Sequence, residues 1–285
     1  MIDLNAKPVL EKLRSQIQNR TERFFKNHHR LPKLVVVLVG EDPASEIYTS
    51  KKRQTAQALG FASETLHLPG STEPKAVEDL IEQLNQDPTV DGILIQRPLP
   101  RAFDEAQVLC WISPEKDVDG FHPLNAGKLF LNLPGLRPCT PAGILELLQH
   151  YQISPAGKMA CVVGRSAIVG KPMAALLLNA NATVFHCHSQ TPNLKKITRE
   201  AEILVVAAGK KEFITRDYVR PQAVVIDVGI HRTASGKITG DVLYSEVASQ
   251  VSAITPVPGG VGPMTIHQLL LNTISAAEVR AEASR

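Results

Sequence analysis

The chain has 285 residues, a length that predicts about two domains. Apolar residues make up 44% of it and charged residues 21%, which is the balance of a globular enzyme. The formal net charge of +3 is too small to indicate nucleic acid, and no apolar run approaches the ~18 residues of a membrane helix, so we expect neither as a partner.

The cysteines and the N-terminal residues bear on the compartment. Residues 1–20 mix charge with an amphipathic pattern and lack the apolar core of a signal peptide. The widely spaced cysteines form no Cys-x-x-Cys pair; they are Cys110, Cys139, Cys161 and Cys187. We therefore expect reduced thiols in a cytoplasmic protein.

Strand-like apolar runs alternate with helical stretches in the first half of the chain. A helix over 43–59 has clear boundaries, because Asp42 can cap its start, Pro43 suits its first turn and Gly60 stops it. The other predicted elements are strands over 33–39, 61–68 and 92–96, a helix over 73–85, a loop-rich region with five prolines over 114–141 and a helix over 142–151.

The second half repeats this alternation more regularly. The predicted elements are strands over 159–163, 182–187, 202–207 and 223–228, a helix over 172–178 and a final helix over 265–281, which we expect to return to the first domain. Alternation of this kind is typical of α/β proteins with parallel sheets.

A glycine turn, Gly164 to Gly170, follows the apolar run 159–163 and precedes the helix over 172–178. A strand that passes through glycine into a helix N-terminus presents unpaired N–H groups and a helix dipole to an anion, which predicts a phosphate site. The turn departs from the Gly-x-Gly-x-x-Gly fingerprint, and a tight turn without a ligand is the alternative.

We therefore predict two α/β domains flanking a cleft, the second a Rossmann-like parallel-sheet nucleotide-binding domain. The first domain would cover 1–138, with the C-terminal helix 265–285 packing back on it, and the second would cover 139–264.

The end of the second strand of that domain indicates which nucleotide it binds. An NAD site usually carries an acidic residue there, for the ribose 2′-hydroxyl. Residues 185–190 contain no acid and instead offer His186, His188 and Ser189, with Arg165 in the turn and Lys195 and Lys196 nearby. This set favours a 2′-phosphate, and therefore NADP. We expect no metal, because the two histidines have no third and fourth ligand at a readable spacing.

Tyr48 and Lys52 lie one turn apart on one face of the helix over 43–59. Lys51 and Arg53 flank Lys52, and both clustered positive charge and partial burial would lower its pKa toward that of a proton carrier. The alternative is a solvated basic helix face with a half-buried tyrosine.

Gln96 closes the strand over 92–96, at the end of a parallel strand where open α/β sheets bind ligands. Its alternative role is to satisfy a loop carbonyl. Asp117 and Asp119 should share one side of an extended segment. There they could act as acid and base, bind a metal or bind an amide-rich heterocycle. The alternative is a loop held by salt bridges.

Residues 255–265 form a segment with three glycines and three prolines. Such a rigid loop with few side chains allows the backbone to approach a flat ligand closely, although a connecting turn is the alternative. Thr265 is positioned to cap the final helix.

These motifs occur in the same order and at the same spacing in one enzyme family, and the chain resembles it from about residue 4 to 274. The family is the bifunctional methylenetetrahydrofolate dehydrogenase/methenyltetrahydrofolate cyclohydrolases. The motifs are Glu41-Asp42-Pro43-Ala44-Ser45 with Tyr48 and Lys52, Gln96 to Pro100, Lys116 to Pro123, Pro138 to Pro141, Gly164 to Gly170, Cys187-His188-Ser189, Ile226 to Ile230, and Pro256 to Thr265.

The resemblance implies NADP as cofactor, tetrahydrofolate substrates and a homodimer. It also implies site residues: Lys52 central to proton transfer and hydrolysis, Gln96 tuning Lys52, Tyr48 positioning the folate, Asp119 anchoring the pterin, Pro258, Gly259 and Gly260 lining the folate pocket, and Gly164, Arg165, Ser166, Ser189 and Ile230 holding NADP.

The chain departs from the family pattern at two notable positions. Ala167 stands where relatives usually carry Asn or His, and Arg97 replaces the usual Leu beside Gln96. We expect Arg97, if buried, to alter the pKa of Lys52 or to contact the glutamate tail of folate. Two other functions remain open from the sequence: an NADP-dependent dehydrogenase of another small substrate, and a non-catalytic nucleotide-binding module.

Overall fold

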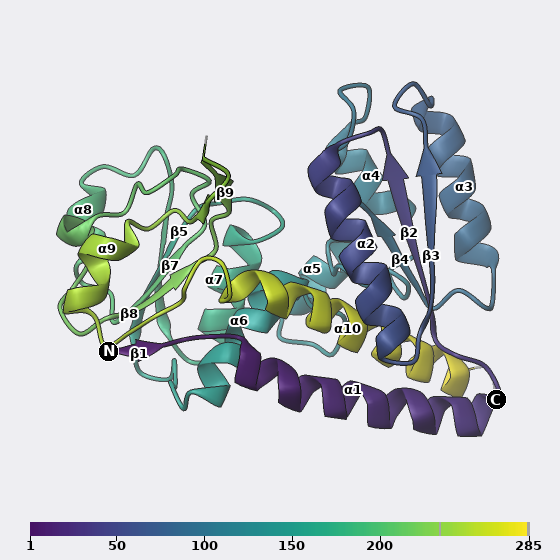
Figure 1. Cartoon of the computed structure of the whole chain (residues 1–285), viewed down its shortest axis with the longest axis horizontal. Coiled ribbons are helices and arrows are strands. Elements are labelled where there is room, and N and C mark those ends of the chain that lie inside the picture. The colour runs from purple at the N-terminus through teal and green to yellow at the C-terminus, as the bar shows by residue number, and fades with distance from the viewer. Residues whose placement is uncertain (234, 284–285) are drawn as a thin grey trace. The chain divides into compact units, whose positions relative to one another are not determined.

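Strands and helices alternate along the chain in the computed structural model of the protein, which describes residues 1–233 and 235–283 (Figure 1). Two compact units contain them. One, here the 140–265 unit, consists of Met1–Glu11, Leu129–Leu133 and Thr140–Thr265. The other, here the 12–128 unit, consists of Lys12–Lys128, Pro134–Cys139 and Ile266–Arg285. The predicted α/β class is confirmed.

The 12–128 unit contains a parallel three-stranded sheet in the order β3-β2-β4. Its strands are β2 (Lys33–Val39), β3 (Ala62–Leu68) and β4 (Gly92–Ile95), and its helices include α2 (Pro43–Ala58), α3 (Pro74–Gln86), α4 (Glu105–Trp111) and α5 (Pro123–Phe130), whose last two residues belong to the other unit.

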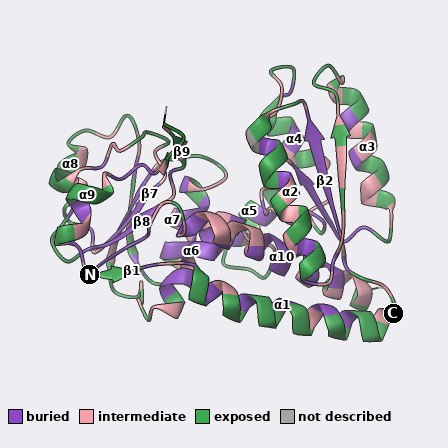
Figure 2. Ribbon diagram, viewed as in Figure 1, coloured by how far each residue is buried: buried purple, intermediate pink, exposed green. Residues whose placement is uncertain are grey.

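The central strand β2 is buried almost throughout, because helices cover both of its faces (Figure 2). Val35, Val37 and Val39 point to one face, where they pack with Val77 of α3 and Val108 of α4. This layer holds the carboxyl end of β4, and therefore Gln96, in a fixed place.

Helix α2 begins where the sequence predicts. The Asp42 carboxylate accepts a hydrogen bond from Ser45 N at 2.8 Å, and Pro43 occupies the first turn. The helix ends at Ala58, and Gly60 follows with a φ of +84°. A Cβ at Gly60 would lie 2.9 Å from Thr21 Oγ1, so both conformation and packing require glycine there.

The 140–265 unit contains a parallel six-stranded sheet in the order β1-β11-β8-β7-β5-β6. Its strands are β1 (Ile2–Asp3), β5 (Met159–Val163), β6 (Thr183–Cys187), β7 (Ile203–Val206), β8 (Val224–Asp227) and β11 (Ala253–Ile254). The helices are α6 (Cys139–His150), α7 (Gly170–Asn179), α8 (Leu194–Thr198) and α9 (Tyr244–Val247), and β9 (His231–Arg232) pairs with β10 (Ile238–Thr239).

Two long helices belong partly to each unit. Helix α1 (Lys7–His28) leaves the 140–265 unit after Glu11, and α10 (Val261–Ala283) enters the 12–128 unit at Ile266. None of the helices in the described residues is long and apolar enough to cross a membrane.

The region 114–141 is loop-rich, as predicted, although it also contains α5 and the start of α6. The predicted start of the last helix is wrong, because α10 begins at Val261, so Thr265 cannot cap it. Its hydroxyl lies 3.0 Å from Thr140 Oγ1 instead. Pro123, Pro141 and Pro263 all fall in the first turn of a helix, where the missing N–H costs nothing.

Candidate functional site

The predicted pair Lys52 and Gln96 meets in the 12–128 unit. Lys52 lies on α2 and Gln96 directly follows β4, and Lys52 Nζ donates a hydrogen bond to Gln96 Oε1 at 2.9 Å. Gln96 Nε2 in turn donates to the carbonyl of Arg97 at 2.6 Å. This second bond orients the carboxamide, so that its oxygen faces the amine.

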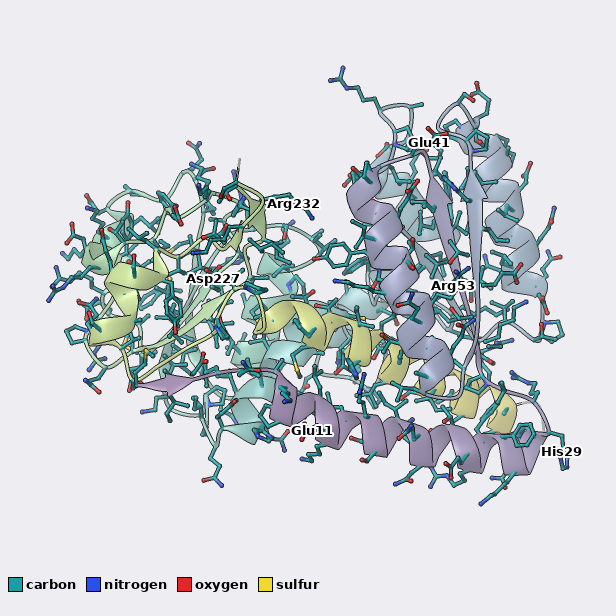
Figure 3. All side chains as sticks on the ribbon, in the orientation of Figure 1. Glu11, His29, Glu41, Arg53, Asp227 and Arg232 are labelled. Carbon is teal, nitrogen blue, oxygen red and sulfur yellow. The ribbon has the colours of Figure 1, made fainter. Side chains whose placement is uncertain are left out.

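Burial lowers the pKa of the Lys52 amine, although Asp119 and Cys139 act in the opposite direction. The flanking cations Lys51 and Arg53 are exposed and do not contribute, so their expected effect is wrong; Figure 3 shows Arg53 on α2. Lys52 is therefore a free base more readily than a lysine exposed to solvent.

Asp119 lies beside this amine. Burial raises the pKa of its carboxyl group, and Lys52 and the nearby Cys139 thiol oppose the increase. The thiol donates a hydrogen bond to the Val118 carbonyl at 3.2 Å. Burial also raises the pKa of Cys139 well above its usual value, so the thiol remains protonated. Asn272 Nδ2, from α10, lies 3.5 Å from Cys139 Sγ and donates to the Val118 carbonyl at 2.8 Å.

The two carboxylates of the 116–120 segment differ in their partners. Asp117 Oδ2 accepts hydrogen bonds from His122 N at 2.7 Å and from Asn125 Nδ2 at 2.9 Å, so Asp117 shapes its own loop. Asp119 carries the interaction with Lys52. The expected acid–base pair is thus one structural carboxylate and one that interacts with the amine.

The other residues predicted to contact folate lie on α2 and in the 140–265 unit. Tyr48 lies one turn before Lys52 on α2 and is 39% exposed, which leaves its ring available to a ligand. Pro258, Gly259 and Gly260 belong to the 140–265 unit. There the Gly259 carbonyl accepts a hydrogen bond from Ala6 N at 2.8 Å.

The glycine turn in the 140–265 unit is dictated by close packing. Gly164 has a φ of +132°, and a Cβ there would lie 2.1 Å from the Ala207 carbonyl oxygen. A Cβ at Gly170 would lie 2.1 Å from the Gly164 carbonyl oxygen. Only glycine fits either position, so that β5, β7 and α7 can approach closely.

The expectation of unpaired N–H groups at the start of α7 is wrong. The Ser166 hydroxyl accepts hydrogen bonds from Val169 N at 3.1 Å and Gly170 N at 3.3 Å, and its carbonyl accepts one from Lys171 N at 3.0 Å. Ser166 therefore caps the helix and occupies N–H groups that an anion would otherwise use.

A hollow of about 260 Å³ lies against this turn. It brings together four of the five predicted cofactor residues, Gly164, Arg165, Ser166 and Ser189; the remaining lining residues are Val163, His188, Leu194, Ala207, Ala208, Lys210 and Phe213. Arg165 and Lys210 supply positive charge, and the lining contains no acid. Ile230, which is 51% exposed, does not line it.

The basic residues expected near the hollow contribute less positive charge to it than predicted. Lys195 forms an ion pair with Asp217 at 3.3 Å and lies over the Tyr218 ring, and neither Lys195 nor Lys196 lines the hollow. His186 Nε2 contacts the Gly164 carbonyl oxygen at 2.8 Å. Lys210, which the sequence analysis missed, does line it, and its signal was a Gly-Lys pair directly after an apolar strand.

Two buried aspartates, also missed, hold the loops around the hollow. Asp241 Oδ2 accepts hydrogen bonds from Ala208 N at 2.7 Å and Gly209 N at 2.9 Å. Asp227, which lies among the strands of the six-stranded sheet in Figure 3, accepts one from Asp241 N at 2.9 Å. Burial raises the pKa of Asp227 to about 6. These bonds position the segment that carries Lys210.

The parallel sheet with its glycine turn and cationic hollow, joined to a unit with a buried lysine, defines a two-domain α/β enzyme of the dinucleotide-binding class. The model of the tetrahydrofolate dehydrogenase/cyclohydrolase catalytic domain matches residues 4–119, and that of the family's NAD(P)-binding domain matches residues 138–281. The chain belongs to this family.

Relatives match the chain over nearly its full length. It is 52% identical to the bifunctional protein FolD of Ligilactobacillus salivarius over 96% of each chain. The crystal structure of FolD from Campylobacter jejuni is 44% identical, with a TM-score of 0.95 over 98% of this chain and 99% of that one. The Trypanosoma brucei enzyme, solved with NADP and an inhibitor, is 32% identical, with a TM-score of 0.93 over 99% and 98%.

Proposed function

We propose that the protein oxidises 5,10-methylenetetrahydrofolate to 5,10-methenyltetrahydrofolate with NADP⁺, and then hydrolyses that product to 10-formyltetrahydrofolate. Similarity to bifunctional relatives over the full chain supports both reactions. The observation that carries the proposal is the Lys52 amine, buried and hydrogen-bonded to Gln96 at 2.9 Å.

The oxidation needs little acid–base help from the protein. Hydride leaves the methylene carbon, and the cation that remains is stabilised by its two adjacent nitrogens. NADP⁺, when bound, supplies the hydride acceptor. The residues of this chain bind and orient the folate, with Asp119 accepting hydrogen bonds from the pterin and the Tyr48 ring packing against the folate.

The hydrolysis needs a base, and Lys52 is suited to that role. Its free amine accepts a proton from water as the water oxygen bonds to the methenyl carbon. The resulting ammonium then returns the proton to N5 as the carbon–N5 bond breaks. The hydroxyl on that carbon loses its own proton to solvent as the C=O bond forms, which leaves the formyl group on N10 and releases one proton overall. The Gln96 oxygen holds the amine in orientation throughout.

The residues around the hollow fit NADP. Gly164 allows β5 and β7 to approach closely at the turn, and Arg165, Ser166, Ser189 and Lys210 offer cations and hydroxyls that suit phosphate oxygens. We also assign Ile230 to the cofactor and Pro258, Gly259 and Gly260 to the folate pocket, as the resemblance implies.

The test is the variant Lys52→Met, assayed for both reactions. Hydrolysis should fall by about 10²–10⁴-fold, the usual loss when a general base is removed. Hydride transfer should persist in part, because it needs no base. Retention of both activities at the level of the unmodified enzyme would remove Lys52 from the mechanism. Lys51→Met, at the exposed neighbour, is the matched control and should leave both rates unchanged.

The two predicted domains bind different ligands in this proposal. We assign residues 1–138 with helix 265–285 to folate binding and residues 139–264 to NADP binding. We propose a homodimer, which light scattering of the purified protein would test; the exposed apolar side chains of Phe130 and Leu131 suit such an interface. We place the protein in the cytoplasm, which agrees with the four free thiols.

A further inference from the structure

Arg97 is held in place by two contacts in the 12–128 unit. Its Nη1 forms an ion pair with Glu105 Oε2 of α4 at 2.7 Å, and its guanidinium carbon lies 6.0 Å from the centre of the Phe121 ring. Only 22% of the side chain is exposed. Contacts with a carboxylate on one element and an aromatic ring on another fix the orientation of the Arg97 guanidinium.

Arg97 also shares a hollow with Asp119. Arg97, Asp117, Asp119 and Phe121 line one small hollow of about 20 Å³. The rest of the lining is apolar: Leu94, Ile95, Val108, Leu109 and Ile112. Charges interact more strongly in such surroundings than in water, because little solvent screens them.

We propose that Arg97 is a positioning residue that keeps the Asp119 carboxylate ionised, and so able to accept hydrogen bonds from the pterin, whenever Lys52 is a neutral base. This inference deepens the proposed function and rests on its assignment of Asp119 to the pterin.

The charges around Asp119 support this role. Burial is the largest influence and disfavours its ionised form, Lys52 from α2 is the strongest group that favours it, and Asp117 of its own segment disfavours it. The Cys139 thiol from α6 and, by a smaller amount, Arg97 after β4 also favour the ionised form. During hydrolysis Lys52 must give up its charge to act as a base. Arg97 is then the remaining cation among these groups, and a guanidinium keeps its charge throughout the pH range in which enzymes work.

The experiment is an NMR titration of the full-length protein labelled at the aspartate carboxyl carbons, without ligands. The Asp119 signal is identified by its loss in Asp119→Asn. In Arg97→Leu the pKa of Asp119 should rise by about 1 unit, as expected when a nearby opposite charge is removed. Arg97→Lys, which keeps the charge, should restore most of the shift.

Two further variants make the result decisive. Arg97→Gln is a second neutral variant of similar length, in case the leucine variant folds poorly. Glu105→Gln keeps a hydrogen-bond acceptor for Arg97 and should not raise the pKa of Asp119. If Asp119 titrates alike in the unmodified protein and in the neutral variants, Arg97 does not hold its charge and the inference is wrong.

Kinetics separate this inference from the proposed function. If both hold, the acidic limb of kcat/KM for methylenetetrahydrofolate oxidation moves to higher pH in Arg97→Leu by the amount that NMR reports, while NADP affinity is unchanged. Absence of both activities in the unmodified protein would overturn the proposed function and leave the NMR comparison valid. A shifted Asp119 with an unmoved pH profile would overturn the part of the inference that concerns the pterin.

Discussion

The low pKa of the Lys52 amine depends on where the end of its side chain lies. Lys52 stands between Lys51 and Arg53 in the sequence of α2, but its pKa is lowered because its own amine is buried, while the two neighbours point elsewhere and remain exposed. The uncharged carboxamide of Gln96 is suited to such an amine, since it orients Nζ without stabilising the ammonium form as a carboxylate would.

Replacing Gln96 with glutamate tests this point. A carboxylate at the Oε1 position, 2.9 Å from Nζ, would favour the ammonium form and raise the pKa of Lys52 by about 1–3 units. Because the free amine is the active base, the limb of the hydrolysis pH–rate profile should move by that amount to higher pH. The measurement is kcat/KM for methenyltetrahydrofolate as a function of pH, corrected for uncatalysed hydrolysis.

Gln96→Met is the control for this variant, since it removes the hydrogen bond without adding charge. It should lower the rate and leave the pH limb close to its original position. An unchanged limb in the glutamate variant would mean that Lys52 is not the titrating base.

At the scale of elements, one buried carboxylate connects α1, the sheet and α10 within the 12–128 unit. Asp91 is fully buried and precedes β4. It accepts hydrogen bonds from Arg30, just after α1, at 2.6 and 2.8 Å and from Lys33 N of β2 at 2.8 Å, and Arg280 of α10 lies 3.4 Å away. This network holds the strand that leads to Gln96.

Asp91→Ala should therefore destabilise the protein by about 3–5 kcal/mol, because it leaves two arginines without their buried partner. Urea unfolding followed by circular dichroism measures the change. Asp91→Asn, which keeps the size of the side chain, should show much of the same loss. Lys75→Ala, which removes an exposed lysine that pairs with Glu78 and Asp79, should leave the urea midpoint unchanged. Equal effects at both sites would refute the special role of Asp91.

At the scale of the whole molecule, each unit has a core of its own. Buried side chains around β5, β7 and β8 form the core of the 140–265 unit, and those around β2 and β4 form a core in the 12–128 unit. A ligand of one unit should therefore stabilise that unit first, by mass action.

NADP at a hundred times its Kd should stabilise the 140–265 unit by about 2.7 kcal/mol, which corresponds to a rise in Tm of roughly 5–10 °C. In Arg165→Ala, loss of one charge-assisted hydrogen bond should weaken binding by about 10–100-fold, and reduce the stabilisation at the same NADP concentration to about 0.4–1.4 kcal/mol. Differential scanning calorimetry measures these shifts.

Lys195→Ala is the matched control, because that lysine pairs with Asp217 and does not line the hollow. Its NADP-induced shift should equal that of the unmodified protein. A larger loss in Lys195→Ala than in Arg165→Ala would mean that the cofactor phosphate binds elsewhere.

Much of the fold was predictable because its determinants are local. The strands over 33–39 and 159–163 appear with their predicted bounds, and the Asp42 cap is present, since apolar runs and capping residues act on their immediate neighbours. The start of the last helix was misplaced because Pro263 lies in its first turn, and composition alone does not tell a proline that ends a helix from one that suits its first turn.

The sequence by itself determined the α/β class, the family resemblance and the residue types available for chemistry. The resemblance also predicted the pairing of Lys52 with Gln96, which the structure confirms. Only the tertiary structure decided that Ser166 caps α7, that Lys210 replaces Lys195 at the hollow and that Arg97 shares a hollow with Asp119. The physical reason is range: secondary structure follows from neighbouring residues, whereas burial, charge and contact are set by segments brought together from distant parts of the chain.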